Sequence, residues 1–239
     1  MLKHPTLDQL HALGLHGMAR AFADMTAADQ AKDLPHADWL ALLLDRETSW
    51  RRDKRLTTRL RAAKLRQQAS VEDVDYHAAR GLDRVLFQKL ADGEWIDAHD
   101  NLALVGPSGV GKSWLACAIG QKACRDNRSV LYHRWPKLCE DLALSRGDGR
   151  HPRLIKSLGQ ADLLILDDFG LEPLGAPAPT VVRLLKPAPS ASVPPAPPRV
   201  IVSVSVAPAL LSPTVTCANG LTGDHGAMAE RHASRYPIG

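Results

Sequence analysis

One short stretch constrains the fold more than any other part of the chain. The apolar run Leu102 to Val105 leads directly into a glycine-rich loop, Gly106 to Ser113, which reads GPSGVGKS. This is the pattern G-x-x-x-x-G-K-[ST], preceded by a run that suits a buried strand and followed by a segment that suits a helix. A strand, a glycine loop and a helix in this order predict a phosphate-binding loop in an α/β sheet.

The loop positions have separate physical roles. Glycine adopts the positive φ angles that turn successive backbone N–H groups toward one anion, and the following helix adds the positive end of its dipole. Lys112 would reach the β- and γ-phosphates, and the Ser113 hydroxyl would bind Mg²⁺. The alternative is a plain glycine turn that binds nothing. The candidate nucleotide-binding residues are Gly106, Pro107, Ser108, Gly109, Val110, Gly111, Lys112, Ser113 and Trp114.

A second candidate element is a buried strand that ends in two acids. Leu163 to Leu166 are apolar in succession, as in a parallel strand covered on both faces, and Asp167 and Asp168 follow them. Ligands of open α/β sheets bind at this end of the strands. We expect Asp167 to bind Mg²⁺ opposite Ser113, and Asp168 to act as the general base for an attacking water. The predicted cofactors are therefore ATP and Mg²⁺.

Composition excludes several classes of protein. No apolar stretch approaches the length of a membrane span, and the first residues do not resemble a secretory signal. The four cysteines lack C-x-x-C spacing, which favours a reduced, cytoplasmic setting. The formal net charge of +4 comes mostly from an acid-poor C-terminal region, so any argument for nucleic acid depends on local clusters.

One such cluster lies in a predicted helix that runs from after Pro35 to about Gln68. The cluster runs from Arg51 to Arg66 and contains eight Lys or Arg residues, one acid, Asp53, and an apolar line that would leave a dense cationic surface. Such a helix can lie along a phosphate backbone, without reading its sequence. A solvated charged face is the alternative. The candidate DNA-binding residues are Arg51, Arg52, Lys54, Arg55, Arg59, Arg61, Lys64 and Arg66.

The remaining pattern predicts a helical module in front of an α/β core. Residues 6–30 read as helix, which Gly14 and Gly17 are expected to break, and Asp83 is expected to cap a short helix that ends near Gly93. We expect three regions: helices over residues 1–68, a nucleotide-binding core over 69–174, and a proline-rich tail over 175–239.

Several blocks together resemble the IstB-like transposition helper ATPases, relatives of the DnaC-type replicative helicase loaders in the AAA+ superfamily. The resemblance runs from about Thr6 to Leu174 and keeps the blocks in one order. These blocks are LDQLHALGLHGMA, LLDRETSWRRDKRLTTRLRAAKLR, GLDR, NLALVGPSGVGKSWLACAIGQKACR, SVLYHR, LALSRGDGR and ADLLILDDFGLEPL.

The resemblance implies an AAA+ P-loop NTPase core, with a parallel sheet flanked by helices. It implies an ATPase that assembles on duplex DNA through non-specific backbone contacts, as a homo-oligomer if the C-terminal part is functional, and recruits a transposase. It also implies that the helices of residues 1–68 form a separate module for the transposase or for DNA. By position, Gly106 to Ser113 would bind phosphate, Asp167 the metal and Asp168 the water. The alternatives are a DnaC-like helicase loader, a remnant that binds nucleotide and DNA without hydrolysis, and a small-molecule phosphotransferase.

The sequence departs from the resemblance after Leu174. Eleven of the seventeen prolines fall between Pro173 and Pro213, a density that favours extended or disordered chain. In the AAA+ arrangement a fourth strand lies between the strands that end at the glycine loop and at Asp167. Without it the core is incomplete, and Arg199 to Val206 is the candidate replacement, although its alternating serines suit a half-buried strand better.

Two explanations of the tail make different predictions. Our hypothesis is that the tail is an out-of-frame translation behind an intact first part, and the alternative is a genuine divergent tail. Translating the other two frames of the coding DNA separates them, because only the first explanation predicts an AAA+-like strand and lid in another frame.

Overall fold

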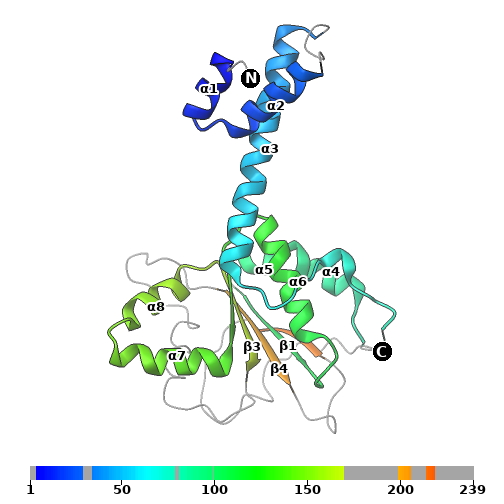
Figure 1. Ribbon diagram of the computed structural model, residues 1–239. Coiled ribbons are helices and arrows are strands. Elements are labelled where there is room, and N and C mark those ends of the chain that lie inside the picture. Colours follow the sequence, from blue (N-terminus) through cyan, green and yellow to red (C-terminus); the bar gives the residue numbers. More distant parts are fainter. Residues whose placement is uncertain are drawn as a thin grey trace. The chain divides into compact units, whose positions relative to one another are not determined.

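The computed structural model describes residues 4–28, 34–78, 81–98, 100–169, 199–205 and 214–218 (Figure 1). The chain divides into two compact units, Met1–Thr58 and Arg59–Gly239. The boundary falls within helix α3, which spans His36–Ala63. Within the described residues, no helix combines the length and apolar character needed to cross a membrane.

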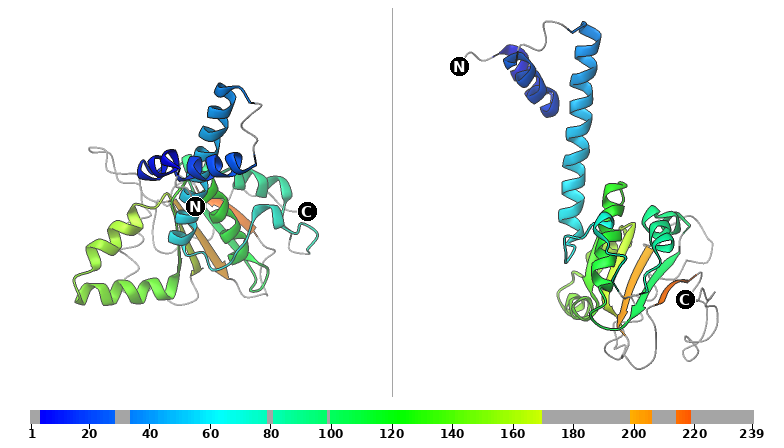
Figure 2. Two further views of the ribbon diagram at one scale, coloured as in Figure 1. Left: turned by 45° about the horizontal axis from the view of Figure 1, so that its top comes forward. Right: turned by 90° about the vertical axis from the view of Figure 1, so that its right-hand side faces the viewer.

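The first unit packs two short helices, α1 (Pro5–Ala12) and α2 (His16–Ala27), with the first part of α3 (Figure 2). Gly14, with φ of +71°, lies in the turn between α1 and α2, so the predicted break there is confirmed. The predicted break at Gly17 is wrong, because Gly17 lies inside α2. A Cβ on Gly17 would lie 2.8 Å from the Arg46 carbonyl oxygen and the Glu47 Cα, so glycine here permits close helix packing.

The end of α3 differs from the prediction. The helix ends at Ala63 rather than near Gln68, because Lys64 adopts a left-handed conformation with φ of 52°. Lys64 and Arg66 therefore belong to the segment that follows the helix. This segment leads through a short 3₁₀ turn, Val71–Asp73, toward the core.

The predicted cap at Asp83 is confirmed. The Asp83 carboxylate accepts hydrogen bonds from the backbone N–H groups of Val85 and Leu86, at 2.7 and 3.2 Å, and α4 (Arg84–Asp92) follows it. Gly93, with φ of 78°, ends α4, and α5 (Glu94–Asp97) leads into the first strand.

The described strands form one sheet with the order β2-β3-β4-β1-β5. The pairs β2–β3, β3–β4 and β4–β1 are parallel, whereas β5 pairs with β1 in the antiparallel sense. The fourth strand thus lies where the AAA+ arrangement requires it, and the antiparallel edge is a departure from the predicted parallel sheet. The strands are β1 (Asn101–Gly106), β2 (Val130–Arg134), β3 (Leu163–Phe169), β4 (Arg199–Ser205) and β5 (Thr214–Ala218).

The candidate replacement strand closes the middle of the sheet. Residues 199–205 pair with both β1 and β3, and Ser205 lies in register with Gly106. Pairing on both edges places this strand in the middle of the sheet. The expectation of a half-buried strand concerns side chains that the structure does not describe, so it stays a prediction. Part of the proline-rich region thus forms regular structure.

Helices cover both faces of the sheet (Figure 1). Helix α6 (Lys112–Arg125) lies against β1 and β3, and Gly120 allows it to approach so closely that a Cβ there would lie 2.7 Å from the Ile165 Cδ1. Helices α7 (Trp135–Gly147) and α8 (His151–Gly159) cover the other face. Leu138, Leu142 and Leu158 of these helices pack with Leu164 and Leu166 of β3. The buried core thus holds the carboxyl end of β3 beside the start of α6.

Candidate functional site

The glycine loop joins the end of β1 to the start of α6. Gly106 is the last residue of β1, and α6 begins at Lys112. Gly109 and Gly111 have φ angles of +87° and +92°, which residues with a side chain rarely adopt. Because α6 starts directly after the loop, the unpaired N–H groups of its first turn lie next to the loop backbone. A phosphate site needs N–H groups in this arrangement.

Lys112 folds back over this loop. Lys112 is buried, and its Nζ donates a hydrogen bond of 2.6 Å to the Pro107 carbonyl oxygen. Burial lowers the pKa of Lys112, while the carboxylates of Asp167 and Asp168 act in the opposite direction. The ammonium group thus lies between the loop and the acids, where phosphate oxygens would be its natural partners.

The two sequence elements meet at Asp167. The Ser113 Oγ donates a hydrogen bond of 2.8 Å to Asp167 Oδ1, although the residues are 54 positions apart. Asp167 is fully buried. A hydroxyl and a carboxylate at this distance are the oxygen ligands that Mg²⁺ prefers.

Tyr132 is a site residue that sequence reasoning missed. Its hydroxyl donates a hydrogen bond of 2.5 Å to Asp167 Oδ2, from the neighbouring strand β2, where Tyr132 pairs in register with Ile165. Burial raises the pKa of Tyr132, and the hydrogen bond to Asp167 raises it further, so the phenol stays protonated. Only the pairing of β2 with β3 identifies this contact.

Arg134 is a second site residue that the sequence did not predict, and its side chain binds Asp168. The guanidinium of Arg134, at the end of β2, contacts Asp168 Oδ2 through Nε at 2.8 Å and through its terminal nitrogen at 2.7 Å. Asp168 has a φ of +58°, and the register between β3 and β4 shifts between Leu166 and Phe169. The predicted general base therefore lies at an irregular strand end and is held in an ion pair.

The eight predicted DNA-binding residues have different surroundings. Arg51 is paired with the buried Glu47, at 2.7 Å, and Lys54 lies over the ring of Trp50. Arg59 is half-buried, and Arg66 lies 3.7 Å from Asp167. The remaining members are exposed, namely Arg52, Arg55, Arg61 and Lys64.

The residues at the loop fit a magnesium–nucleotide complex. Mg²⁺ commonly takes one or two protein oxygens and completes its coordination with water and phosphate. Ser113 and Asp167 supply such a pair. Among the described residues, no group of three or more His, Cys, Asp or Glu side chains forms an all-protein metal cage. Trp114, also predicted to bind nucleotide, lies half-buried in the first turn of α6.

This geometry defines the class of the protein. A glycine loop at the end of a parallel strand, with the fourth strand between β1 and the acid-bearing β3, is the core of an AAA+ P-loop protein. The sequence pattern of the IstB-like ATP binding proteins matches residues 8–186, and the chain belongs to this family. The match extends beyond Leu174, where we expected the resemblance to end.

Individual relatives agree with the family. The chain is 64% identical over 178 residues to y4pL of Sinorhizobium fredii, described as an insertion sequence ATP-binding protein, and the alignment covers 74% of this chain and 73% of that protein. It is 47% identical to the IS1162 ATP-binding protein of Pseudomonas fluorescens, over 73% of this chain and 76% of that protein. The crystal structure of the DnaC helicase loader matches 52% of this chain and 68% of that chain, with 17% identity and a TM-score of 0.43.

Proposed function

We propose that this protein is an ATP-dependent helper of DNA transposition. It would bind ATP with Mg²⁺, hydrolyse it while assembled as a homo-oligomer on duplex DNA, and recruit a transposase in the cytoplasm. The proposal that the protein binds ATP depends on the 2.8 Å hydrogen bond between Ser113 and Asp167. This bond joins the glycine loop to the acid-ended strand, and we call the place where they meet the corner. The insertion-sequence names of the relatives support transposition rather than helicase loading.

Each residue of the corner has a role in this proposal. The loop N–H groups and Lys112 bind the phosphates, and Ser113 and Asp167 hold the ion. Bound Mg²⁺ would stabilise the charge that develops on the phosphate oxygens. Asp168 would accept a proton from the attacking water, and for this its carboxylate must part from Arg134, which now holds it at 2.7 Å. Nucleotide turnover should therefore depend on movement at the end of β2.

The proposal for DNA depends on charge. The exposed cations Arg52, Arg55 and Arg61 lie on α3, and phosphate contacts of this kind supply affinity without sequence preference. Arg51 is a weaker candidate than the others, because its guanidinium already neutralises Glu47.

Measurement of ATP turnover with and without duplex DNA tests the proposal. We expect Mg²⁺-dependent hydrolysis by the full chain, and we expect Lys112→Ala to abolish nucleotide binding or turnover, because the phosphates lose their buried cation. Lys89→Ala in α4 is a matched lysine control. Normal turnover by Lys112→Ala would refute the site assignment. Binding without turnover in the wild type would favour the non-hydrolysing remnant, and co-purification with a replicative helicase would favour the loader.

A further inference from the structure

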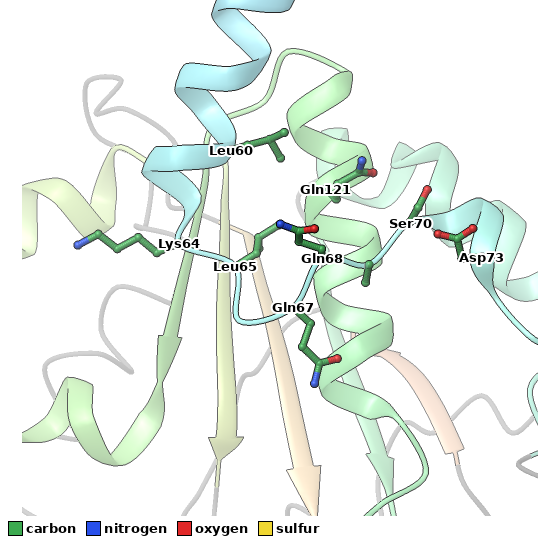
Figure 3. Close-up of a pocket in the computed structure, with 9 residues that line it drawn as sticks. Leu60, Lys64, Leu65, Gln67, Gln68, Ser70, Asp73 and Gln121 are labelled. Atoms are coloured by element: carbon green, nitrogen blue, oxygen red, sulfur yellow. The ribbon is translucent and has the colours of Figure 1, made fainter.

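Arg66 lies on a segment that is attached to the nucleotide-binding core. Beyond the end of α3 the chain crosses α6, and Figure 3 shows Lys64, Leu65 and Gln68 on this segment. The Leu65 side chain approaches within 3.1 Å of the Cβ position of Gly120. Farther along, Glu72 pairs with Arg125 at the end of α6, at 2.6 Å. The segment therefore has a defined position on α6.

The backbone of Arg66 is anchored on the same helix. Burial raises the pKa of the Cys117 thiol, and hydrogen bonds from the backbone of Gln67 and Arg66 to this thiol act against the rise. Cys117 is fully buried and lies one helical turn after Ser113. The backbone of Arg66 is thus attached next to the proposed magnesium ligands.

The side chain of Arg66 reaches the same corner from the solvent side. Its terminal nitrogen lies 3.7 Å from Asp167 Oδ2; the Arg66 side chain is 49% exposed, whereas Asp167 is 0% exposed. The Arg66 side chain also interacts with the Tyr132 hydroxyl, an effect that lowers the pKa of Tyr132 against the larger effect of burial. Arg66 is therefore a half-exposed cation, on an anchored backbone, directed at the carboxylate that would hold Mg²⁺.

We propose that Arg66 competes with Mg²⁺ for the charge of Asp167 and is released toward DNA phosphate when the magnesium–nucleotide complex binds. This inference rests on the proposed function. A divalent ion held by Ser113 and Asp167 would neutralise the carboxylate and repel the guanidinium, so the attraction between Arg66 and Asp167 would be lost. Arg66 is the last cation of the basic stretch 51–66, so a released guanidinium adds one phosphate contact to that stretch.

The proposal assigns a reciprocal linkage between two ligands. If bound Mg²⁺ frees Arg66 for DNA, then DNA that engages Arg66 removes it from Asp167 and strengthens Mg²⁺ binding by the same factor. Arg66 is thus a positioning residue that acts through Asp167. If Arg66 and Asp167 formed only an ordinary surface ion pair, Mg²⁺ binding and DNA binding would not affect each other. Measuring the two affinities together therefore distinguishes the linkage from a simple ion pair.

The test measures magnesium-dependent binding of a non-hydrolysable ATP analogue by the full chain, with and without duplex DNA. For the wild type we expect duplex to tighten this binding about fivefold. Arg66→Gln should show the tighter binding already without duplex, and duplex should then add little. Arg61→Gln is the control on α3: it should weaken duplex binding but keep the fivefold linkage.

A conservative variant separates charge from structure. Arg66→Lys keeps the positive charge beside Asp167, so its binding without duplex should resemble that of the wild type. Two results would overturn the inference: a wild type that binds analogue and duplex independently, or an Arg66→Gln variant with undiminished linkage. Either result leaves the proposed function in place, whereas a wild type that fails to bind the analogue would overturn the proposed function itself.

Discussion

Substitution of Tyr132 by Phe removes a single hydrogen bond from a buried carboxylate. The Tyr132 hydroxyl donates to Asp167 Oδ2 at 2.5 Å, and Asp167 is 0% exposed. The phenyl ring that remains fills almost the same volume, so no large cavity forms. The perturbation therefore isolates the interaction of one donor with one buried charge.

The expected loss follows from this burial. A hydrogen bond to a charged group contributes about 1.5–3 kcal/mol, and water cannot readily replace the donor at a fully buried oxygen. The second unit, Arg59–Gly239, is of the size for which 1 kcal/mol corresponds to about 2–4 °C in Tm. Tyr132→Phe should therefore lower the Tm by about 3–12 °C.

Thermal and urea unfolding without nucleotide or Mg²⁺ measure this loss. Tyr76→Phe is the matched control, because Tyr76 is half-buried and its ring, rather than its hydroxyl, contacts Phe87 and Arg84. The control should change the free energy of unfolding by less than about 0.5 kcal/mol. A loss as small as this for Tyr132→Phe would refute the view that Tyr132 stabilises the charge of Asp167.

The dependence of the free energy of unfolding on alkaline pH provides a second test of Tyr132. Burial and Asp167 raise the pKa of Tyr132 above its ordinary value of 10.0. The unfolded chain therefore loses this proton first, so the contribution of Tyr132 is complete below pH 10 and decreases as the pH rises further. Tyr132→Phe should lack this part of the pH dependence.

The remaining predictions concern the helical module and the DNA surface. Replacing Arg52, Arg55 and Arg61 together by Gln should weaken duplex binding, measured by fluorescence anisotropy. The slope of log K against log salt should become less steep by about 0.9 for each phosphate that is no longer neutralised. An unchanged slope would mean that these residues do not bind DNA. Gly17→Ala should destabilise the first unit by about 1–3 kcal/mol, because its Cβ would meet backbone of α3 at 2.8 Å. Hydrogen exchange in α2 measures this, with Gly147→Ala, whose Cβ has open space, as the control.

The sequence alone determined the parts of this protein whose chemistry is local. The glycines of the loop, with Lys112 and Ser113 at fixed offsets, make the loop recognisable without knowledge of the rest of the fold. The positive φ angles of Gly109 and Gly111 agree with this reading. The cap at Asp83 is equally local, because its partners are two and three residues away. The strands that end at the glycine loop and at the acid pair also followed from their local apolar runs.

Tertiary structure decided which distant side chains share the corner. Tyr132 and Arg134 contact the acid pair only because β2 pairs with β3, and Arg66 reaches Asp167 only because α3 ends at Ala63. The same holds for β4, whose central position depends on pairing with β1 and β3 rather than on its own alternation of side chains. A local pattern records the preferences of neighbouring residues, whereas strand pairing and charge contacts depend on residues brought together across the whole core.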